Sequence, residues 1–574
     1  MRNKKTLFIL ICMILMTSAV YAENTNTMTL LAVKETNNGL VGGTATLSLE
    51  VNSGKGRVFL ETSPLTKIDT QVSTRFAKEI ACKTADLECS SYDFIYTVKS
   101  DAPIIGGPSA GAAMGVLTLA SVKGAKCDQK TAITGTINSG GIIGAVGGVK
   151  EKIDAAKTAG LTKVLVPLGE NLKINETENA TISPEEYGNK IGMTVKEVGT
   201  LNEAYKEFTG QTLQEETTGD VEIDSEYIEI MKNVAEKLCN RSEELVNSLK
   251  TNETKEIEAK LNTSKTLFNK TDYYSAASLC FSSNVRLGSI ASKELTNEEL
   301  AEKITRLASK INEYDKIISR MELKTMPQLQ TYMIVKERIN EAEDYLNKSI
   351  SSNSSTELRA YYYAYSEERL NSAISWSAFF KKKGVDANIS KEALKESCTE
   401  KISEADDRMQ YVLTLYPAEL EGVKDTINNA KKYQEKEEYA LCINAGALAK
   451  ADVDSIISTM GATDEASIKK LIELKLKVAK ANIIKKQSQG FFPIAGYSYY
   501  EYSKNLMEDN VYSSLLFSQY ALELSSFDFK TEKTARAITT TESKKSGYEY
   551  VLVYIIGIIT GVILTYMVIM RDID

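Results

Sequence analysis

The sequence predicts a mixed α/β domain over residues 28–208, followed by an all-α region over residues 227–530. Up to residue 208, apolar residues alternate or cluster in strand-length runs that are separated by turns rich in glycine and asparagine. Beyond residue 227, apolar residues recur at steps of three and four, and only three prolines interrupt the pattern. The polar, acidic residues 209–226 between the two parts predict a linker. Because 574 residues exceed one ordinary core, a division into domains is expected.

The α/β domain is expected to begin with strands and to continue with helices and strands in alternation. The turns "NNGL" and "SGKG" separate the first three apolar runs, and a glycine-rich turn precedes an alanine-rich helix that ends near Val122. The expected strands or strand-like segments are 28–35, 43–52, 56–63, 93–99, 131–138, 140–148 and 163–168, and the other expected helices are 70–83 and 150–160.

Four related stretches stand out in the all-α region. Each opens on tyrosine and continues with small residues at helical spacing, with markers at Tyr273, Tyr362, Tyr439 and Tyr512. This pattern is typical of the second helix of a tetratricopeptide-like hairpin. The intervals of 89, 77 and 73 residues are too uneven for a regular repeat. A divergent helical stack and an ordinary long helical bundle both fit the pattern.

Both ends of the chain indicate export and a membrane anchor. Residues 1–22 combine early cations, an apolar run and small residues before Ala22, which is the order of a secretory signal peptide. Residues 550–570 contain no charge and are long enough for one transmembrane helix. The sequence therefore predicts a single-pass protein of the cell membrane, with the α/β domain and the helical region on the extracytoplasmic side.

Charge and cysteine content narrow the functional classes. The net charge of −8 is spread along the chain without a long basic block, so nucleic-acid binding is not expected. Cys239 and Cys280 are 41 positions apart, and Cys398 and Cys442 are 44 apart, which suggests one disulfide per helical hairpin in an oxidising compartment. Cys82 and Cys89 flank a short loop, and Cys127 would then be left over. Unpaired buried thiols are the alternative.

The stretch "GGPSAGAAMG" contains a G-x-S-x-G pattern centred on Ser109. Such a pattern places a serine nucleophile where a strand ends and a helix begins, with a histidine as its usual base. The chain has no histidine, which excludes the common triad, and no C-x-x-C pair that would indicate zinc. A tight turn with a serine N-cap is the structural alternative. If Ser109 is a nucleophile, lysine is the remaining nitrogen base. Gly107 and Ala110, on either side of Pro108 and Ser109, are expected to support the turn.

Lys150 and Lys152 are the candidate bases, at the start of the helix that follows Gly147 and Gly148. A lysine base has to lose about three units of pKa, or about 4 kcal/mol, through burial or cationic neighbours. Lys152 falls on the helical face of Ile153 and Ala156, whereas a pair of solvated lysines is the alternative interpretation.

Residues 106–167 contain four ordered motifs, "GPSAG", "TGTI", "GGVKEK" and "VLVP", and in this they resemble the proteolytic domain of Lon proteases. The resemblance covers about residues 28–208. It implies that Ser109 is the nucleophile, that Lys152, 43 positions later, is the general base, and that Thr134 supports the lysine amine.

The chain also departs from the Lon pattern. Gly106 stands where most Lon proteins have an acid, Thr136 stands where glutamate is usual, and no G-x-x-x-x-G-K-[ST] loop for ATP is present in the sequence. The overall plan resembles Lon-like membrane proteins of archaea that lack the ATPase.

The resemblance implies an ATP-independent serine endopeptidase with a Ser-Lys dyad, which acts on peptides or on unfolded and exposed protein segments. We expect no cofactor or metal and no use of ATP. Protein or peptide substrates and the membrane are the expected partners, and a homo-oligomer is left open. The alternatives are a non-catalytic surface binding protein with a helical interaction domain, and a self-processing protease that cuts its own linker.

Overall fold

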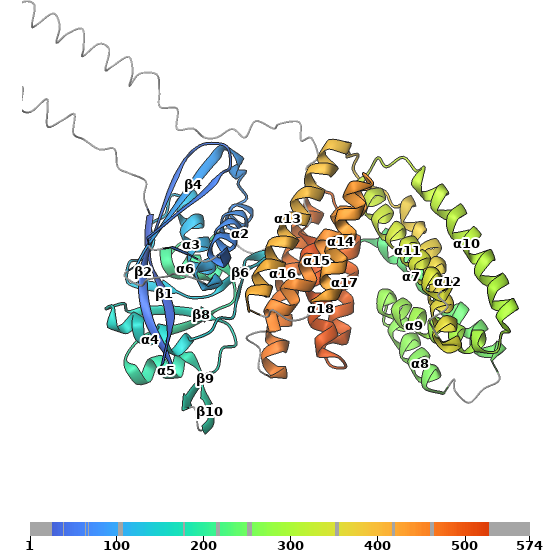
Figure 1. Ribbon diagram of the computed structural model, residues 1–574, viewed down its shortest axis with the longest axis horizontal. Coiled ribbons are helices and arrows are strands. Elements are labelled where there is room, and N and C mark those ends of the chain that lie inside the picture. The colour runs from blue at the N-terminus through green and yellow to red at the C-terminus, as the bar shows by residue number, and fades with distance from the viewer. Residues whose placement is uncertain are drawn as a thin grey trace, which may run out of the picture.

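The structure is a computed structural model that describes residues 26–526, except 38, 64, 67, 101–106, 176–177, 214–218, 250–254, 351–354, 388, 416–419 and 460–463. The predicted signal peptide, the predicted transmembrane helix and Gly106 lie outside the described residues. No helix within the described ranges is long and apolar enough to cross a membrane. An α/β domain comes first and an all-helical region follows it (Figure 1).

A seven-stranded mixed sheet forms the centre of the α/β domain, in the order β11-β8-β5-β1-β2-β4-β3. β1 pairs with β2 antiparallel and with β5 parallel. The strands β5, β8 and β11 on one side of β1 are parallel, whereas on the other side β2 is antiparallel to β4 and the edge strand β3 is parallel to β4. The strands are β1 Asn26–Thr36, β2 Gly39–Ser53, β3 Val58–Ser63, β4 Tyr92–Lys99, β5 Thr131–Ile133, β8 Lys163–Pro167 and β11 Thr194–Val198, with the separate pairs β6 Thr136–Asn138 and β7 Ile142–Gly144, and β9 Leu172–Asn175 and β10 Glu178–Ile182.

Helices cover both faces of this sheet because its strands carry apolar side chains on both sides. In β1, Met28 and Leu30 belong to one core and Leu31 to the other. The first core includes α2 Ile68–Ala85, α3 Gly111–Val122 and α6 Leu201–Thr209, and the second includes α4 Val149–Thr158 and α5 Pro184–Ile191.

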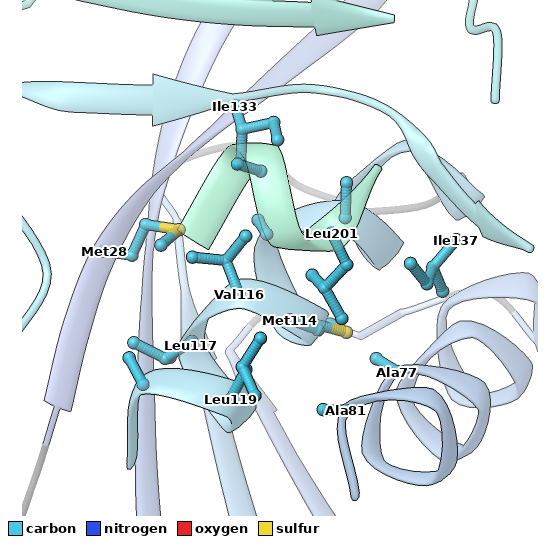
Figure 2. Close-up of a cluster of buried hydrophobic side chains, with 14 of the residues drawn as sticks. Met28, Ala77, Ala81, Met114, Val116, Leu117, Leu119, Ile133, Ile137 and Leu201 are labelled. Carbon is cyan, nitrogen blue, oxygen red and sulfur yellow. The ribbon is translucent and has the colours of Figure 1, made fainter. Parts of the chain in front are cut away.

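Helix α3 lies deep in the first core. Its residues from Gly111 to Ala120 are all buried, which explains why the helix is apolar on every side. Figure 2 shows Met114 and Val116 of α3 among Leu201 of α6 and Ile133 of β5, with Ala77 of α2 on the other side.

In the helical region, helices pack both against the next helix in the chain, as in α11 with α12, and against the one after that, as in α13 with α15. The four tyrosine-led stretches correspond to α9, α12, α15 and α18, and each packs against the helix before it. The helices are α7 Ser225–Ser248, α8 Lys255–Asn269, α9 Tyr273–Lys293, α10 Asn297–Ser319, α11 Met326–Ile350, α12 Thr356–Trp376, α13 Lys391–Leu415, α14 Glu421–Glu435, α15 Tyr439–Thr459, α16 Glu465–Ser488, α17 Ile494–Leu506 and α18 Val511–Ser525.

Three disulfides join the cysteines that the sequence suggested as partners: Cys82–Cys89, Cys239–Cys280 and Cys398–Cys442. The two long-range bridges join α7 to α9 and α13 to α15, so each crosses over an intervening helix instead of closing a two-helix hairpin. Cys127 is buried and is a free thiol.

The structure refines several expected elements. The expected strand 131–138 is divided into β5 and β6, because the chain leaves the sheet at Thr134 and Gly135. Strands β9 to β11 and helices α5 and α6 were not predicted, and α12 begins at Thr356, ahead of its tyrosines. Most of the expected linker precedes α7, which begins at Ser225.

Candidate active site

Ser109 lies on a short 3-10 turn, η2 (Pro108–Ala110), that leads directly into the buried helix α3. Gly107 before it has a φ of 112°, in the region that favours glycine, and Ala110 is the N-cap of α3. The Ser109 side chain is only partly buried. It therefore sits at the positive end of a helix, where backbone N–H groups favour a negatively charged oxygen.

Backbone hydrogen bonds hold this turn against the segment that follows β5. The N–H of Gly135 donates to the carbonyl of Ser109 at 3.0 Å, and the N–H of Ala112 donates to the carbonyl of Gly135 at 3.0 Å. A Cβ on Gly111 would lie 3.0 Å from the backbone nitrogen of Ile137, so this close approach favours glycine. The position of Ser109 thus depends on residues 135–137.

Thr134, directly before Gly135, is fully buried. Its N–H donates to the carbonyl of Leu165 at 3.1 Å. Its side-chain Oγ1 is buried and has no hydrogen-bond partner within the described part of the chain. An unpaired buried hydroxyl is unfavourable and uncommon, and such groups are found where a functional site needs a donor or acceptor.

Lys152 lies one turn into α4, which begins after Gly148 in a left-handed conformation. Only 2% of Lys152 is exposed, because the neighbouring Val149 and Ile153 belong to the core on this face of the sheet. Strand β2 approaches closely: a Cβ on Gly42 would lie 2.0 Å from the carbonyl oxygen of Glu151. The helix therefore holds the lysine in an interior setting.

Burial lowers the pKa of Lys152 from 10.5 to about 8, against the opposing charges of Glu170 and Glu151. Lys152 forms no ion pair with any residue that the structure describes. Lys150, two positions earlier, is half-exposed and pairs with Asp154 at 3.1 Å. Of the two candidate lysines, Lys152 has the environment that a neutral base requires.

Glu170 is a site residue that the sequence did not indicate. It follows β8 and accepts a hydrogen bond from the N–H of Val146 at 3.2 Å, just before α4. Burial raises the pKa of Glu170 to about 7, although the charge of Lys152 opposes this shift. Its position, three residues after the strand that ends at Pro167, was the only available signal.

Ser109 and Lys152 are connected through one segment of the chain. Ser109 bonds to Gly135, and the hairpin that starts at Thr136 leads through Gly144 to α4. No hydrogen bond joins the Ser109 hydroxyl to the Lys152 amine in the described residues. Hydrogen bonds between catalytic groups often tighten only when substrate binds. A serine at a helix N-terminus and a buried lysine are suited to acyl transfer.

Three carboxylates come together elsewhere, where α2 meets α13. Oxygens of Glu79, Glu400 and Glu404 lie within 4.8 Å of one another. Glu404 also pairs with Lys401 at 2.8 Å and Lys450 at 2.7 Å. Lys83 pairs with Glu79 at 2.6 Å, so three cations offset the charge of the three carboxylates and the cluster does not resemble a cation site.

Comparison with known proteins identifies the α/β domain. Residues 66–207 match the family model of the Lon protease (S16) C-terminal proteolytic domain. A Lon protease of Lachnoclostridium phytofermentans is 33% identical over 172 residues, which is 29% of this chain and 20% of the relative. An archaeal Lon protease of Methanocaldococcus jannaschii is 30% identical over 107 residues, or 19% of this chain and 16% of the relative.

These matches are limited in extent. The aligned part spans about a fifth of the length of these relatives, which come from both bacteria and an archaeon. The similarity thus concerns the α/β domain and does not distinguish a bacterial from an archaeal source. Within that range, the resemblance drawn from the four motifs is confirmed. The chain therefore contains a Lon-type (S16) proteolytic domain, which implies a serine peptidase and supports a proteolytic function.

Proposed function

We propose that the chain is an ATP-independent serine endopeptidase in which Ser109 is the nucleophile and Lys152 is the general base. The burial of Lys152 carries this proposal. The side chain is 2% exposed, forms no ion pair among the described residues and has a pKa lowered to about 8. A buried lysine without a side-chain hydrogen bond to any described residue, on the same domain as a serine at the N-terminus of a buried helix, is a candidate functional group.

The reaction follows from these two groups. Neutral Lys152 takes the proton of the Ser109 hydroxyl while Oγ attacks the scissile carbonyl carbon. Backbone N–H groups at the start of α3 stabilise the tetrahedral oxyanion. The Lys152 ammonium then returns the proton to the leaving amine, and the acyl-enzyme forms. Water, deprotonated by Lys152, hydrolyses the ester and restores Ser109.

Substrate class and location follow from the sequence. The sequence contains no G-x-x-x-x-G-K-[ST] loop for ATP, which supports action on peptides, unfolded segments and exposed loops instead of ATP-driven unfolding. The predicted signal peptide and the predicted C-terminal transmembrane helix support a location of the protease and helical parts on the outer face of the cell membrane. The helical region presents substrates or holds the site away from the membrane.

The test is hydrolysis of casein and fluorogenic peptides by the full chain, with and without ATP. Ser109→Ala and Lys152→Ala are expected to reduce kcat by about a thousandfold or more, since dyad members act as a unit. Lys150→Ala, on the same helix turn, is the matched control and should stay within about twofold. Activity should not depend on ATP.

Three outcomes would contradict the proposal. A wild-type chain that cleaves nothing but binds proteins would support the surface binding protein. A single cut within residues 209–226 that Ser109→Ala abolishes, with no cleavage in trans, would support self-processing. Equal loss in Lys150→Ala and Lys152→Ala would show that Lys152 has no special role.

A further inference from the structure

The hairpin of β6, η3 (Ser139–Gly141) and β7, here called the linking hairpin (residues 136–144), connects the two halves of the proposed dyad. At one end, Gly135 donates its N–H to the carbonyl of Ser109. At the other end, Gly144 is followed within a few residues by Gly148, the N-cap of α4. Any displacement of this hairpin therefore changes how Ser109 and Lys152 face each other.

Helices of the C-terminal region bind the linking hairpin through buried polar contacts. Ser139 donates its hydroxyl hydrogen bond to Asp454 of α15 at 2.9 Å. Arg408 of α13 donates to the carbonyl of Ile137 at 3.0 Å and pairs with Asp454 at 3.1 Å. The side chains of Arg408 and Asp454 are 4% and 0% exposed. Figure 1 shows β6 on the side of the α/β domain that faces these helices.

Apolar contacts close around the tip of the same hairpin. A Cβ on Gly140 would lie 2.8 Å from Leu522 of α18 and 2.9 Å from Val478 of α16. Gly140 has a φ of 71°, so both its backbone and its surroundings favour glycine. Ile142 is buried in a cluster with Leu474 and Leu522. The hairpin tip is thus fitted into the helical region with no free space at Gly140.

Buried charges make this arrangement specific. Arg408 and Asp454 lose their hydration, and only well-placed partners compensate for that loss. The carbonyl of Ile137 and the hydroxyl of Ser139 supply such partners from the hairpin. The guanidinium of Arg408 also stacks 3.8 Å from the ring centre of Phe76 on α2. Arg408 Nε and Asp454 Oδ1 lie 3.1 Å apart and have no hydrogen-bond partner within the described residues, so loss of the hairpin contacts would leave still more of this buried pair unpaired.

We propose that Arg408 and Asp454 are positioning residues for the Ser109–Lys152 dyad. The helical region, beyond holding substrate or acting as a spacer, sets the geometry of the active site through the linking hairpin. This inference rests on the proposed peptidase function. The protease domain is then incomplete without the helices that follow it.

The experiment compares three variants of the full chain. Ser139→Ala removes one contact of the hairpin and keeps the ion pair of Arg408 with Asp454. Arg408→Ala removes both the hydrogen bond to the carbonyl of Ile137 and the ion pair with Asp454. Lys485→Ala is the matched control, because its ion pair with Asp86 at 2.8 Å joins the same two parts of the molecule but does not involve the hairpin.

Two readouts are used: kcat and KM on a fluorogenic peptide, and the pH midpoint for chemical labelling of the Lys152 amine, measured by mass spectrometry. We expect kcat to fall about fivefold or more in Ser139→Ala and about fiftyfold or more in Arg408→Ala, with KM within about twofold, because small displacements of reacting groups have large kinetic effects. The labelling midpoint should move upward from about 8 in both variants as water reaches Lys152. Lys485→Ala should change neither readout, and Ser139→Thr should restore both.

The two readouts separate failure of this inference from failure of the proposed function. Folded Ser139→Ala with wild-type kcat and midpoint would overturn the inference while peptidase activity stands. If the wild-type chain cleaves nothing, the proposed function fails, and an unmoved midpoint would overturn the inference as well. If Arg408→Ala does not fold, Ser139→Ala alone decides.

Discussion

Two buried lysines, one in each part of the molecule, differ in their surroundings and not in their burial. Lys152 in the α/β domain and Lys475 on α16 are each 2% exposed, and burial lowers the pKa of each to about 8. Lys475 donates to the hydroxyl of Ser458 at 2.9 Å and to the side chain of Gln519. Lys152 has no such hydrogen bond in the part of the chain that the structure describes.

This difference shows that a lowered lysine pKa does not by itself mark a catalytic base. Ser458 is the serine next to Lys475, but its hydroxyl already donates to the carbonyl of Asp454 at 2.6 Å, one turn earlier on α15. That arrangement is a satisfied structural contact. Lys152, by contrast, forms no hydrogen bond or ion pair with its side chain among the described residues, and it lies on the domain whose buried Thr134 hydroxyl is unpaired. Missing partners, together with burial, indicate the functional site.

The pH dependence of activity should distinguish the two lysines most strongly. Only the neutral form of Lys152 accepts a proton, so kcat/KM should rise about tenfold per pH unit up to a plateau above about pH 8. Lys475→Met should leave the midpoint of this rise unchanged. The measurement is kcat/KM on one peptide between pH 5.5 and 9.5. A profile that is flat between pH 6 and 9 would exclude Lys152 as the base.

The local parts of the site could be predicted from the sequence. The Ser109 turn is encoded by adjacent glycines, and the register of Lys152 with Ile153 on one helix face favours Lys152 over Lys150 as the base. Both signals extend over a few residues. Because the sequence contains no histidine, lysine is the remaining nitrogen base.

The parts of the site that depend on long-range packing could not be predicted. Ser139 and Asp454 are 315 positions apart, and no periodic pattern connects them. Glu170 reaches the start of α4 because α4 packs on the face of the sheet to which Val164 and Val166 of β8 contribute side chains. The similar intervals between cysteines suggested the two long-range disulfide partners. They did not indicate that each bridge crosses over an intervening helix.

The free energy of unfolding should also distinguish the two lysines, but with a smaller effect than the pH dependence of activity. At pH 7 both lysines are mostly protonated although they are buried. Burial of the charge lowers the free energy of unfolding by about 1.4 kcal/mol for each unit by which the pKa is lowered. We expect Lys152→Met to raise the free energy of unfolding by about 2–3 kcal/mol while it abolishes activity. In Lys475→Met the increase in the free energy of unfolding should be smaller by about 1–3 kcal/mol, because the Gln519 side chain then loses the hydrogen bond that Lys475 donates to it. Urea unfolding at pH 7 measures both.

The sign of the pH effect on stability follows from the same shift. The pKa of Lys152 is lower in the folded state, about 8, than in the unfolded state, 10.5. Between these values the unfolded chain binds more protons, so wild-type stability should rise with pH through this window. Below pH 8 the full penalty is present. The increase of stability with pH should be smaller in Lys152→Met than in the wild type. An equal increase in the two proteins would mean that other titrating groups cause it.

Substitution of Glu170 should have the smallest effect on activity. The direction in which the pH profile shifts tests whether the Glu170 carboxylate acts on Lys152 through its charge. Its negative charge raises the pKa of Lys152, so Glu170→Gln should lower that pKa and move the activity rise to lower pH by about half a unit. At pH 7 this is an increase of about two- to threefold in kcat/KM. The glutamine keeps an oxygen that can accept the hydrogen bond from Val146, so the start of α4 should stay in place.

Glu197→Gln is the matched control for this prediction. Glu197 lies on β11, accepts a hydrogen bond from the N–H of Gly169 at 3.0 Å, and raises the pKa of Glu170. It acts on Glu170, whereas no effect of its charge on Lys152 is found. Its removal should therefore lower the pKa of Glu170 and leave the activity rise within about 0.2 units. A rise that moves to higher pH in Glu170→Gln would mean that the carboxylate keeps α4 closed around Lys152, since water entering the site raises the lysine pKa. The direction of the shift thus decides whether Glu170 acts on the base by its charge or by its hydrogen bond.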